Sequence, residues 1–361
     1  YWAEQYPFEE RMIEINKYPQ YKTNIQGLDV HFVRVTPEVP LGVRVVPLLV
    51  LHGWPSSFLD FYPMIPVLTS VSPYRDFAIE VIAASLPGFA FSDGAIRPGF
   101  GVDKMAVVLR NLMQRLGYKK FYVHGADWGS VVLSNMATFF PDEILGYHSS
   151  MPTNVSPLQL FARIVGNYFP SLVVRPEVAD RMYPLSKFLN KIILESGYFH
   201  LQATKPDTID IALTDSPAGL LAYYFEKISV GTREHYRYRS DGGLQLHYTK
   251  EQLIDNLMVY WISNSMATAG RIYAESFSPR YFGLRMDSIP SSVPAWILQA
   301  KYEISYIPPW LYKLKFPNLI NETTLDTGGH FLALELPLVL AEDIMKAMVQ
   351  FRSQYKGHDE L

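Results

Sequence analysis

The sequence contains no cysteine, few charged residues and no long apolar run, and each absence narrows what the protein can do. Without cysteine, disulfide bonds, thiol catalysis and cysteine-ligated metals are excluded. Charged side chains make up only 19% of the 361 residues and the formal net charge is −3, so the composition does not indicate a nucleic-acid or polyanion partner. No run of 18 apolar, uncharged residues occurs, so no membrane span is predicted.

What remains is a chain rich in apolar and aromatic side chains. Hydrophobic residues account for 48% of the sequence and aromatic residues for 14%, which predicts a large core together with a buried, aromatic-lined cavity. The length exceeds that of one typical domain, but α/β folds that carry an insertion often reach it.

The central motif is Gly125-Ala126-Asp127-Trp128-Gly129, a Gly-x-Asp-x-Gly sequence between an apolar run and a helix-spaced apolar segment. This layout is typical of a nucleophile elbow, a sharp strand-to-helix turn whose small residues let it close and expose its middle side chain. Serine usually holds that position. Asp127 in its place predicts a carboxylate nucleophile, which attacks saturated carbon and forms an alkyl ester that water must hydrolyse. The alternative is an ordinary aspartate at a turn or helix start.

Short apolar runs alternate with amphipathic segments along most of the chain, which predicts an α/β fold with a parallel sheet and right-handed crossovers. We expect strands at 28–35, 45–51, 78–83, 119–124, 144–147, 293–299 and 319–325, and flanking helices at 102–116, 130–140 and 338–355. Ligand sites in such sheets lie at the carboxyl ends of the strands, where the Asp127 turn also falls.

The middle of the chain has a different pattern, because residues 152–265 carry few strand-like runs and many helix-spaced apolar residues. We expect helices there at 155–173, 187–197, 216–229 and 250–266, so this segment is predicted to form a helical cap over the sheet edge. The core then consists of 29–151 and 266–361. Residues 1–28 are expected to form a helical segment up to Pro19 that packs on the core.

The loop after the predicted strand 45–51 is a candidate oxyanion hole. It reads His52-Gly53-Trp54-Pro55, in which a glycine at the strand tip lets the following backbone face the sheet edge. The Trp54 N–H is therefore the expected donor to a developing oxyanion. A plain strand-to-helix turn remains the alternative.

His330 completes the chain order of nucleophile, acid and histidine that is typical of an α/β-hydrolase. It lies in a Gly-Gly-His-Phe loop between the last predicted strand and the last helix, where glycines let the imidazole reach the elbow. Two acids could orient it: Glu303, which follows the strand ending at Gln299, and Asp287, which precedes that strand. Glu303 is better placed, because the acid should leave the carboxyl end of a strand and accept the Nδ1–H.

Two tyrosines, Tyr198 and Tyr273, are candidates for activating an oxygen leaving group. A phenol can donate a hydrogen bond to such an oxygen and then protonate the departing alkoxide. The chain has 24 tyrosines, so the residues alone select these two only weakly. Their assignment depends on a resemblance to a known family.

The whole set of motifs resembles the microsomal-type epoxide hydrolases of the α/β-hydrolase superfamily and, among them, the insect juvenile hormone epoxide hydrolases. The likeness runs nearly end to end and includes segments at 11–29, 52–55, 127–130, 195–198, 205–208, 215–217 and 328–331. It implies an α/β-hydrolase fold, in which a mostly parallel sheet is flanked by helices and a helical cap is inserted after the sixth strand.

The resemblance also implies a role for each candidate side chain. Asp127 would be the nucleophile, His330 the base and Glu303 the charge-relay acid, which settles the choice between the two acids. Tyr198 and Tyr273 would form the pair that activates the epoxide oxygen by donating protons to it.

The oxyanion hole would consist of the backbone N–H groups of Trp54 and Trp128. The implied substrates are water and a small lipophilic epoxide, such as a juvenile hormone or a related terpenoid or xenobiotic epoxide, and the product is a vicinal diol. The chemistry requires neither a metal nor an organic cofactor, and no nucleic acid takes part.

Proteins of that family carry an N-terminal membrane anchor, with the catalytic body on the cytosolic face of the endoplasmic reticulum. This sequence begins at Tyr1, so we expect a fragment that lacks its anchor and a location at that membrane. The last four residues, His358-Asp359-Glu360-Leu361, match an endoplasmic-reticulum retention address. A luminal address conflicts with a cytosolic body, so this match carries no conclusion.

Three other functions compete with epoxide hydrolysis. A haloalkane dehalogenase shares the aspartate elbow and the histidine, and Trp128 could serve a halide. However, residue 54 is Trp rather than Asn, and the tyrosine pair suits an oxygen leaving group. An inactive fold that binds a lipophilic hormone is disfavoured because Asp127, Glu303 and His330 are all present. A serine esterase is disfavoured because aspartate occupies the nucleophile position.

Overall fold

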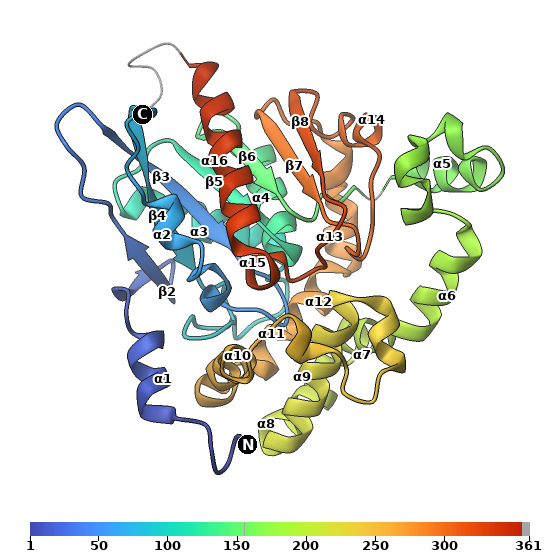
Figure 1. The fold of residues 1–361 in the computed structure, drawn as a ribbon, viewed down its shortest axis with the longest axis horizontal. Coiled ribbons are helices and arrows are strands. Elements are labelled where there is room, and N and C mark those ends of the chain that lie inside the picture. Colours follow the sequence, from blue (N-terminus) through green and yellow to red (C-terminus); the bar gives the residue numbers. More distant parts are fainter. Residues whose placement is uncertain (155, 356–361) are drawn as a thin grey trace.

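An eight-stranded sheet forms the centre of the molecule (Figure 1). The computed structural model describes residues 1–154 and 156–355. Strand β2 pairs antiparallel with β1 and β4, and the pairs from β4 through β8 are parallel, in the order β1-β2-β4-β3-β5-β6-β7-β8. The strands are β1 Gln20–Ile25, β2 Leu28–Val35, β3 Arg44–Leu51, β4 Phe77–Ala84, β5 Phe121–Gly125, β6 Ile144–Ser149, β7 Ala295–Gln299 and β8 Leu319–Thr324. The predicted α/β-hydrolase fold is confirmed, with the cap inserted after the sixth strand.

Alternate side chains of the central strands pack into hydrophobic cores on opposite faces of the sheet. In β3, Leu49 and Leu51 face one core, whereas Leu48 and Val50 face the other, as the two-residue period of a strand requires. A strand that is buried on both faces needs a continuous apolar run, and such runs made these strands predictable from the sequence. The first core includes α3 Val102–Arg115 and α4 Asp127–Phe139, the second includes α16 Pro337–Ser353, and the connections contain α2 Ile65–Leu68, α14 Pro309–Tyr312 and α15 Leu332–Glu335.

Helices fill the chain between β6 and β7, and their α5–α6 end stands to one side of the body (Figure 1). Local sequence explains several helix starts. Ser216 accepts the Gly219 N–H ahead of α9, and Thr249 and Gln252 form a capping box at α10. The helices are α5 Pro157–Tyr168, α6 Leu185–Glu195, α7 Gly197–Thr204, α8 Pro206–Asp215, α9 Pro217–Thr232, α10 Lys250–Ser263, α11 Met266–Ala269, α12 Arg271–Ser276 and α13 Pro279–Leu284. The helical stretch thus continues beyond residue 265, where the sequence placed the end of the cap.

The N-terminal segment contains the helix predicted before Pro19 and, after it, a strand that was not predicted. It forms helix α1 (Phe8–Ile15) and then strand β1, which pairs with β2 at the edge of the sheet. The sequence of β1, QYKTNI, is polar because half of this edge strand is exposed and only Ile25 is buried. A polar edge strand lacks an apolar alternation, so the sequence pattern missed it.

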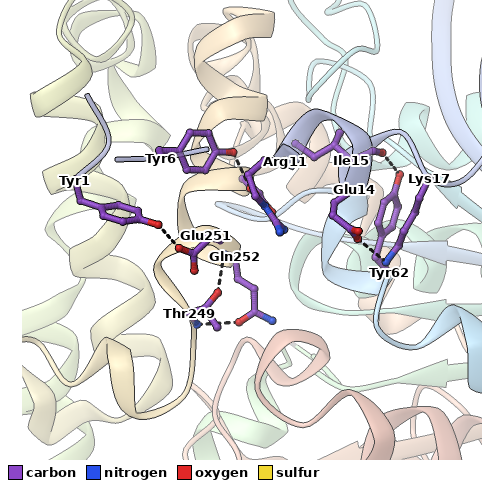
Figure 2. A network of polar contacts seen from close by, with 11 residues as sticks. Tyr1, Tyr6, Arg11, Glu14, Ile15, Lys17, Tyr62, Thr249, Glu251 and Gln252 are labelled. Atoms are coloured by element: carbon purple, nitrogen blue, oxygen red, sulfur yellow. Dashed lines mark hydrogen bonds and ion pairs between the residues drawn. The ribbon is translucent and has the colours of Figure 1, made fainter. Parts of the chain in front are cut away.

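Polar contacts join this N-terminal segment to both the cap and the core (Figure 2). Asp255 on α10 accepts hydrogen bonds from the Tyr6 hydroxyl at 2.7 Å and from Arg11 at 2.6 Å. On the core side, the Tyr62 hydroxyl donates to the Ile15 carbonyl at 2.7 Å. The segment before β1 therefore bridges cap helix α10 and the core.

Across residues 1–154 and 156–355, no helix combines the length and apolarity that crossing a bilayer requires. The predicted anchor would precede Tyr1, so it stays a prediction. The retention-like tetrapeptide at 358–361 lies outside the described residues.

Candidate active site

The turn between β5 and α4 has the backbone strain expected of a nucleophile elbow. Asp127 has a φ of +47°, in the left-handed region that side chains other than glycine rarely adopt. A Cβ on Gly125 would lie 2.7 Å from the Gly129 backbone, and a Cβ on Gly129 would lie 2.2 Å from the Leu51 carbonyl oxygen, so both motif glycines are needed. The N-cap of α4 is Ala126, without a side-chain cap. Asp127 is therefore not the ordinary capping aspartate of the alternative interpretation.

The Asp127 carboxylate faces the loop that follows β3. The Trp54 N–H donates to Asp127 Oδ1 at 2.7 Å, and a Cβ on Gly53 would lie only 2.1 Å from the same oxygen. His52 supports the loop by donating from Nδ1 to the Gly53 carbonyl at 2.9 Å. Burial lowers the pKa of His52 to about 4, so this ring stays neutral. Trp128, the second predicted donor, follows Asp127 in α4, and its role stays a prediction.

His330 lies between two carboxylates. Its Nδ1 is 2.7 Å from Glu303 Oε1, and its Nε2 is 3.5 Å from Asp127 Oδ2. The side chains of His330 and Glu303 are each 5% exposed, so water screens the pair little. Asp287, the other candidate acid, lies before β7 in a short helical turn, where its charge acts on Lys315. The structure therefore brings Glu303, and not Asp287, to the imidazole.

Contacts from cap helix α9 and from α15 hold the histidine loop in place. The His330 N–H donates to the Gly231 carbonyl at 2.8 Å, and the Gly329 N–H donates to Glu335 Oε2 at 2.8 Å. Glu335 also forms a buried ion pair with Arg233 at 2.5 Å. Sequence reasoning did not single out Gly231, Arg233 or Glu335. No local signal marks them, because their contacts form only when the end of α9 meets the loop after β8.

The charge state of His330 reflects opposing effects. Burial alone would lower its pKa, but attraction to Glu303, together with the hydrogen bond and charge of Asp127, raises the pKa to about 10. The ring is therefore an imidazolium at neutral pH.

The raised pKa of His330 also makes the stability of the fold depend on pH. Because this pKa lies above the ordinary histidine value of about 6.5, the ionised ring makes its full contribution to the free energy of unfolding at pH values below about 6.5. The contribution is lost as the pH rises through about 10.

Tyr198 on α7 and Tyr273 on α12 meet beside the elbow. Their ring centroids are 5.9 Å apart, with the ring planes at 82°. The Tyr198 ring stacks on Trp54 at 5.2 Å, and the Tyr273 ring packs edge-on against Trp128 at 4.8 Å. Burial is the largest cause that raises the pKa of each phenol. The negative charge of Asp127 comes next for Tyr198, whereas for Tyr273 the neighbouring Tyr198 comes before Asp127. Both therefore stay protonated and can donate hydrogen bonds.

A cavity of about 260 Å³ opens onto Trp54, Tyr198 and His330. Its wall is largely apolar, with three charged side chains besides His330 among its lining residues, and includes Phe188, Ile192, Phe199, Val230, Phe331, Lys191, Glu195 and Lys227. Such a wall suits a lipophilic molecule. In the part of the chain that the structure describes, no three histidine or acidic side chains gather to hold a metal ion.

The chain is similar to known proteins over its full length. Residues 1–61 match the family described as epoxide hydrolase N terminus, and residues 46–175 match the family described as alpha/beta hydrolase fold. Juvenile hormone epoxide hydrolase of Bombyx mori is 56% identical over 100% of this chain and 78% of its own length. The Manduca sexta juvenile hormone epoxide hydrolase is 46% identical over 99% and 77%. The crystal structure of the Bombyx mori enzyme matches with a TM-score of 0.97, covering 98% of this chain and 84% of that one.

Proposed function

This chain belongs to the microsomal-type epoxide hydrolases of the α/β-hydrolase fold, and from that premise we propose how its residues open an epoxide and which epoxides they accept. Its reaction adds water to an epoxide and gives a vicinal diol. One observation carries the proposed mechanism: the Asp127 carboxylate accepts the Trp54 N–H through one oxygen and faces the His330 imidazole with the other. A carboxylate held in this way is positioned to attack as a nucleophile.

In the first half-reaction, Asp127 Oδ2 attacks a ring carbon of the epoxide in line with the breaking bond. A new carbon–oxygen ester bond forms, the ring bond breaks, and its electron pair stays on the epoxide oxygen. Tyr198 and Tyr273 hydrogen-bond that oxygen, and one phenol gives it a proton. The products of this step are a hydroxyalkyl ester of Asp127 and a phenolate.

In the second half-reaction, His330 takes a proton from a water molecule, which attacks the ester carbonyl carbon of Asp127. The Trp54 N–H, joined by that of Trp128, stabilises the oxyanion by roughly 3–4 kcal/mol per donor. The acyl carbon–oxygen bond then breaks, the imidazolium protonates the departing alkoxide, and the diol leaves. The proton on the new Asp127 carboxylic acid returns through solvent to the phenolate. His330 takes back from solvent the proton that its imidazolium released before it acted as a base, which restores the resting enzyme.

Alkylation itself would turn the histidine into a base. The ester carries no charge, so the attraction between Asp127 and the imidazolium disappears and the pKa of His330 falls. Glu303 remains bonded to Nδ1 and keeps the ring oriented. Hydrolysis of the ester requires the neutral imidazole, so this step should slow as the pH falls.

Removing the phenol hydroxyls tests the first half-reaction. Tyr198→Phe or Tyr273→Phe should each slow ester formation by about 10–100-fold, because one donor to the epoxide oxygen is lost while the ring packing stays. The double variant should lose nearly all ester formation. Rapid-quench single-turnover measurements check this, with Tyr168→Phe, an exposed tyrosine on α5, as the control. Unchanged rates in both single variants would remove the two tyrosines from the mechanism.

The substrate class we propose is a lipophilic terpenoid epoxide, with juvenile hormone as the first candidate. The largely apolar cavity wall supports a lipophilic substrate, and the similar proteins of Bombyx mori and Manduca sexta are named for juvenile hormone. Xenobiotic epoxides are the competing class for the same cavity.

Comparing two epoxides separates these classes. If the cavity is built for a long terpenoid chain, kcat/KM for juvenile hormone should exceed that for styrene oxide by at least about tenfold, because more apolar surface is buried in the transition state. Diol release measured by chromatography under identical conditions gives both values. A kcat/KM that is equal for the two, or higher for styrene oxide, would favour a detoxifying role.

A further inference from the structure

A lysine of the cap lies over the ring of one active-site tyrosine. The Lys227 Nζ on α9 is 4.8 Å from the centroid of the Tyr198 ring and 5.3 Å from that of Tyr223. Both distances fall within the range of a cation–π contact. Lys227 and Tyr198 also line the same cavity, together with Trp54, so the ammonium group lies at the active site.

Lys227 is a mostly buried cation whose direct counter-ion lies closer to solvent. Its ion-pair partner is the adjacent Glu226, whose side chain is 55% exposed, whereas that of Lys227 is 13% exposed. Water therefore screens the glutamate far more than the lysine. The nearby Glu195 of α6 is itself paired with Arg237. Glu226 and Glu195 therefore offset part of the lysine charge, and the ammonium group also acts on the aromatic ring that it covers.

The two active-site tyrosines differ in the charge that lies over each ring. In the described residues, no lysine or arginine lies over the Tyr273 ring, which packs against aromatic side chains, among them Trp128 and Phe199. Tyr198 has both the Trp54 indole stacked on it and the Lys227 ammonium over it. A phenol that gives up its proton becomes a phenolate, and a cation near that ring stabilises the negative charge.

We propose that Lys227 is a positioning residue that makes Tyr198, rather than Tyr273, the tyrosine that transfers its proton. When the ring carbon–oxygen bond breaks, the epoxide oxygen keeps the electron pair and takes the proton of Tyr198, while the ammonium group stabilises the resulting phenolate. Tyr273 stays protonated and donates a hydrogen bond. This inference rests on the proposed role of the tyrosine pair.

Single-turnover ester formation tests the inference. Lys227→Met should slow this step by about tenfold, and Lys227→Arg should restore most of the rate because it returns the positive charge. In a Tyr198→Phe background, Lys227→Met should change the rate by less than about twofold, whereas in a Tyr273→Phe background its full effect should remain. KM should change little in Lys227→Met, because the charge acts on the transition state.

Several outcomes would overturn the inference. A normal rate in Lys227→Met, with Tyr198→Phe still slow, would reject the lysine's role and leave the proposed mechanism intact. Equal slowing by Lys227→Met in all backgrounds, or no rescue by arginine, would show a structural effect. A normal rate in Tyr198→Phe would instead reject the tyrosine scheme itself.

Two controls make these outcomes interpretable. Lys250→Met removes a similar contact outside the cavity lining, where Lys250 Nζ lies 4.9 Å from the Tyr1 ring, and it should leave the rate unchanged. If Lys227→Met does not fold, Lys227→Gln is compared with Lys227→Arg at matched melting temperature.

Discussion

Asp127→Asn is expected to abolish diol formation and to lower kcat by about 10⁴-fold or more. Asparagine has the same shape and tolerates the left-handed backbone at this position, where φ is +47°, so the elbow should persist. Its amide oxygen is a poor nucleophile and cannot form the ester. Diol release from freshly purified protein is the measurement, because slow deamidation would restore aspartate.

The same variant should also lower the pKa of His330. Burial lowers this pKa and attraction to Glu303 raises it most, while the hydrogen bond and charge of Asp127 add to the rise that brings it to about 10. Asparagine removes the charge at position 127, and burial continues to favour the neutral ring. An NMR titration of the imidazole measures the shift against the unaltered protein. A circular dichroism spectrum identical to that of the unaltered enzyme is the control for folding. Turnover within tenfold of the unaltered enzyme would show that Asp127 is not the nucleophile.

His330→Gln is expected to stop the reaction after its first half. Glutamine cannot take a proton from water, so the ester should form but hydrolyse about 10²–10⁴-fold more slowly. Intact-protein mass spectrometry after mixing with an epoxide should then show the mass of the protein plus one substrate. Peptide mapping should locate the added mass on Asp127.

Two further variants give this experiment its controls. The double variant with Asp127→Asn should show no adduct, because the nucleophile is gone. His235→Gln changes an exposed histidine on the cap surface and should leave turnover unchanged. The two-step scheme is wrong if His330→Gln releases diol at the normal rate. It is also wrong if none of the epoxides that the enzyme turns over gives an adduct with this variant.

Local backbone chemistry explains why so much of the site could be predicted from the sequence. The elbow and the loop after β3 need glycine wherever a side chain would collide with neighbouring atoms, as at Gly53 and Gly129. Such requirements act over a few residues and leave a readable motif. The strands that carry these turns are buried on both faces, so their apolar runs are equally visible.

The parts that could not be predicted depend on contacts between distant segments. Tyr198 and Tyr273 lie on different helices, and residue patterns select them only weakly among 24 tyrosines, so their pairing depended on the resemblance to a known family. Lys227 lies on a third helix, α9, and only the folded chain places it over the Tyr198 ring. Strand β1 was missed for another reason, because an exposed edge strand carries polar residues.

The choice of acid shows where topology decides between similar residues. Glu303 and Asp287 flank β7 on opposite sides, and both carry a carboxylate that could orient a histidine. In a parallel sheet the carboxyl ends of the strands meet at one edge, so the residue that follows β7 reaches His330 at 2.7 Å.

Isotope labelling tests the covalent role of Asp127 most directly. The enzyme, in excess over an epoxide, is allowed a single turnover in H₂¹⁸O, and the Asp127 peptide and the diol are then analysed by mass spectrometry. If Asp127 forms the ester, water attacks its carbonyl carbon, so the label should enter the Asp127 carboxylate and the first diol should contain none. Label in that first diol, with none in Asp127, would mean that water opens the epoxide directly.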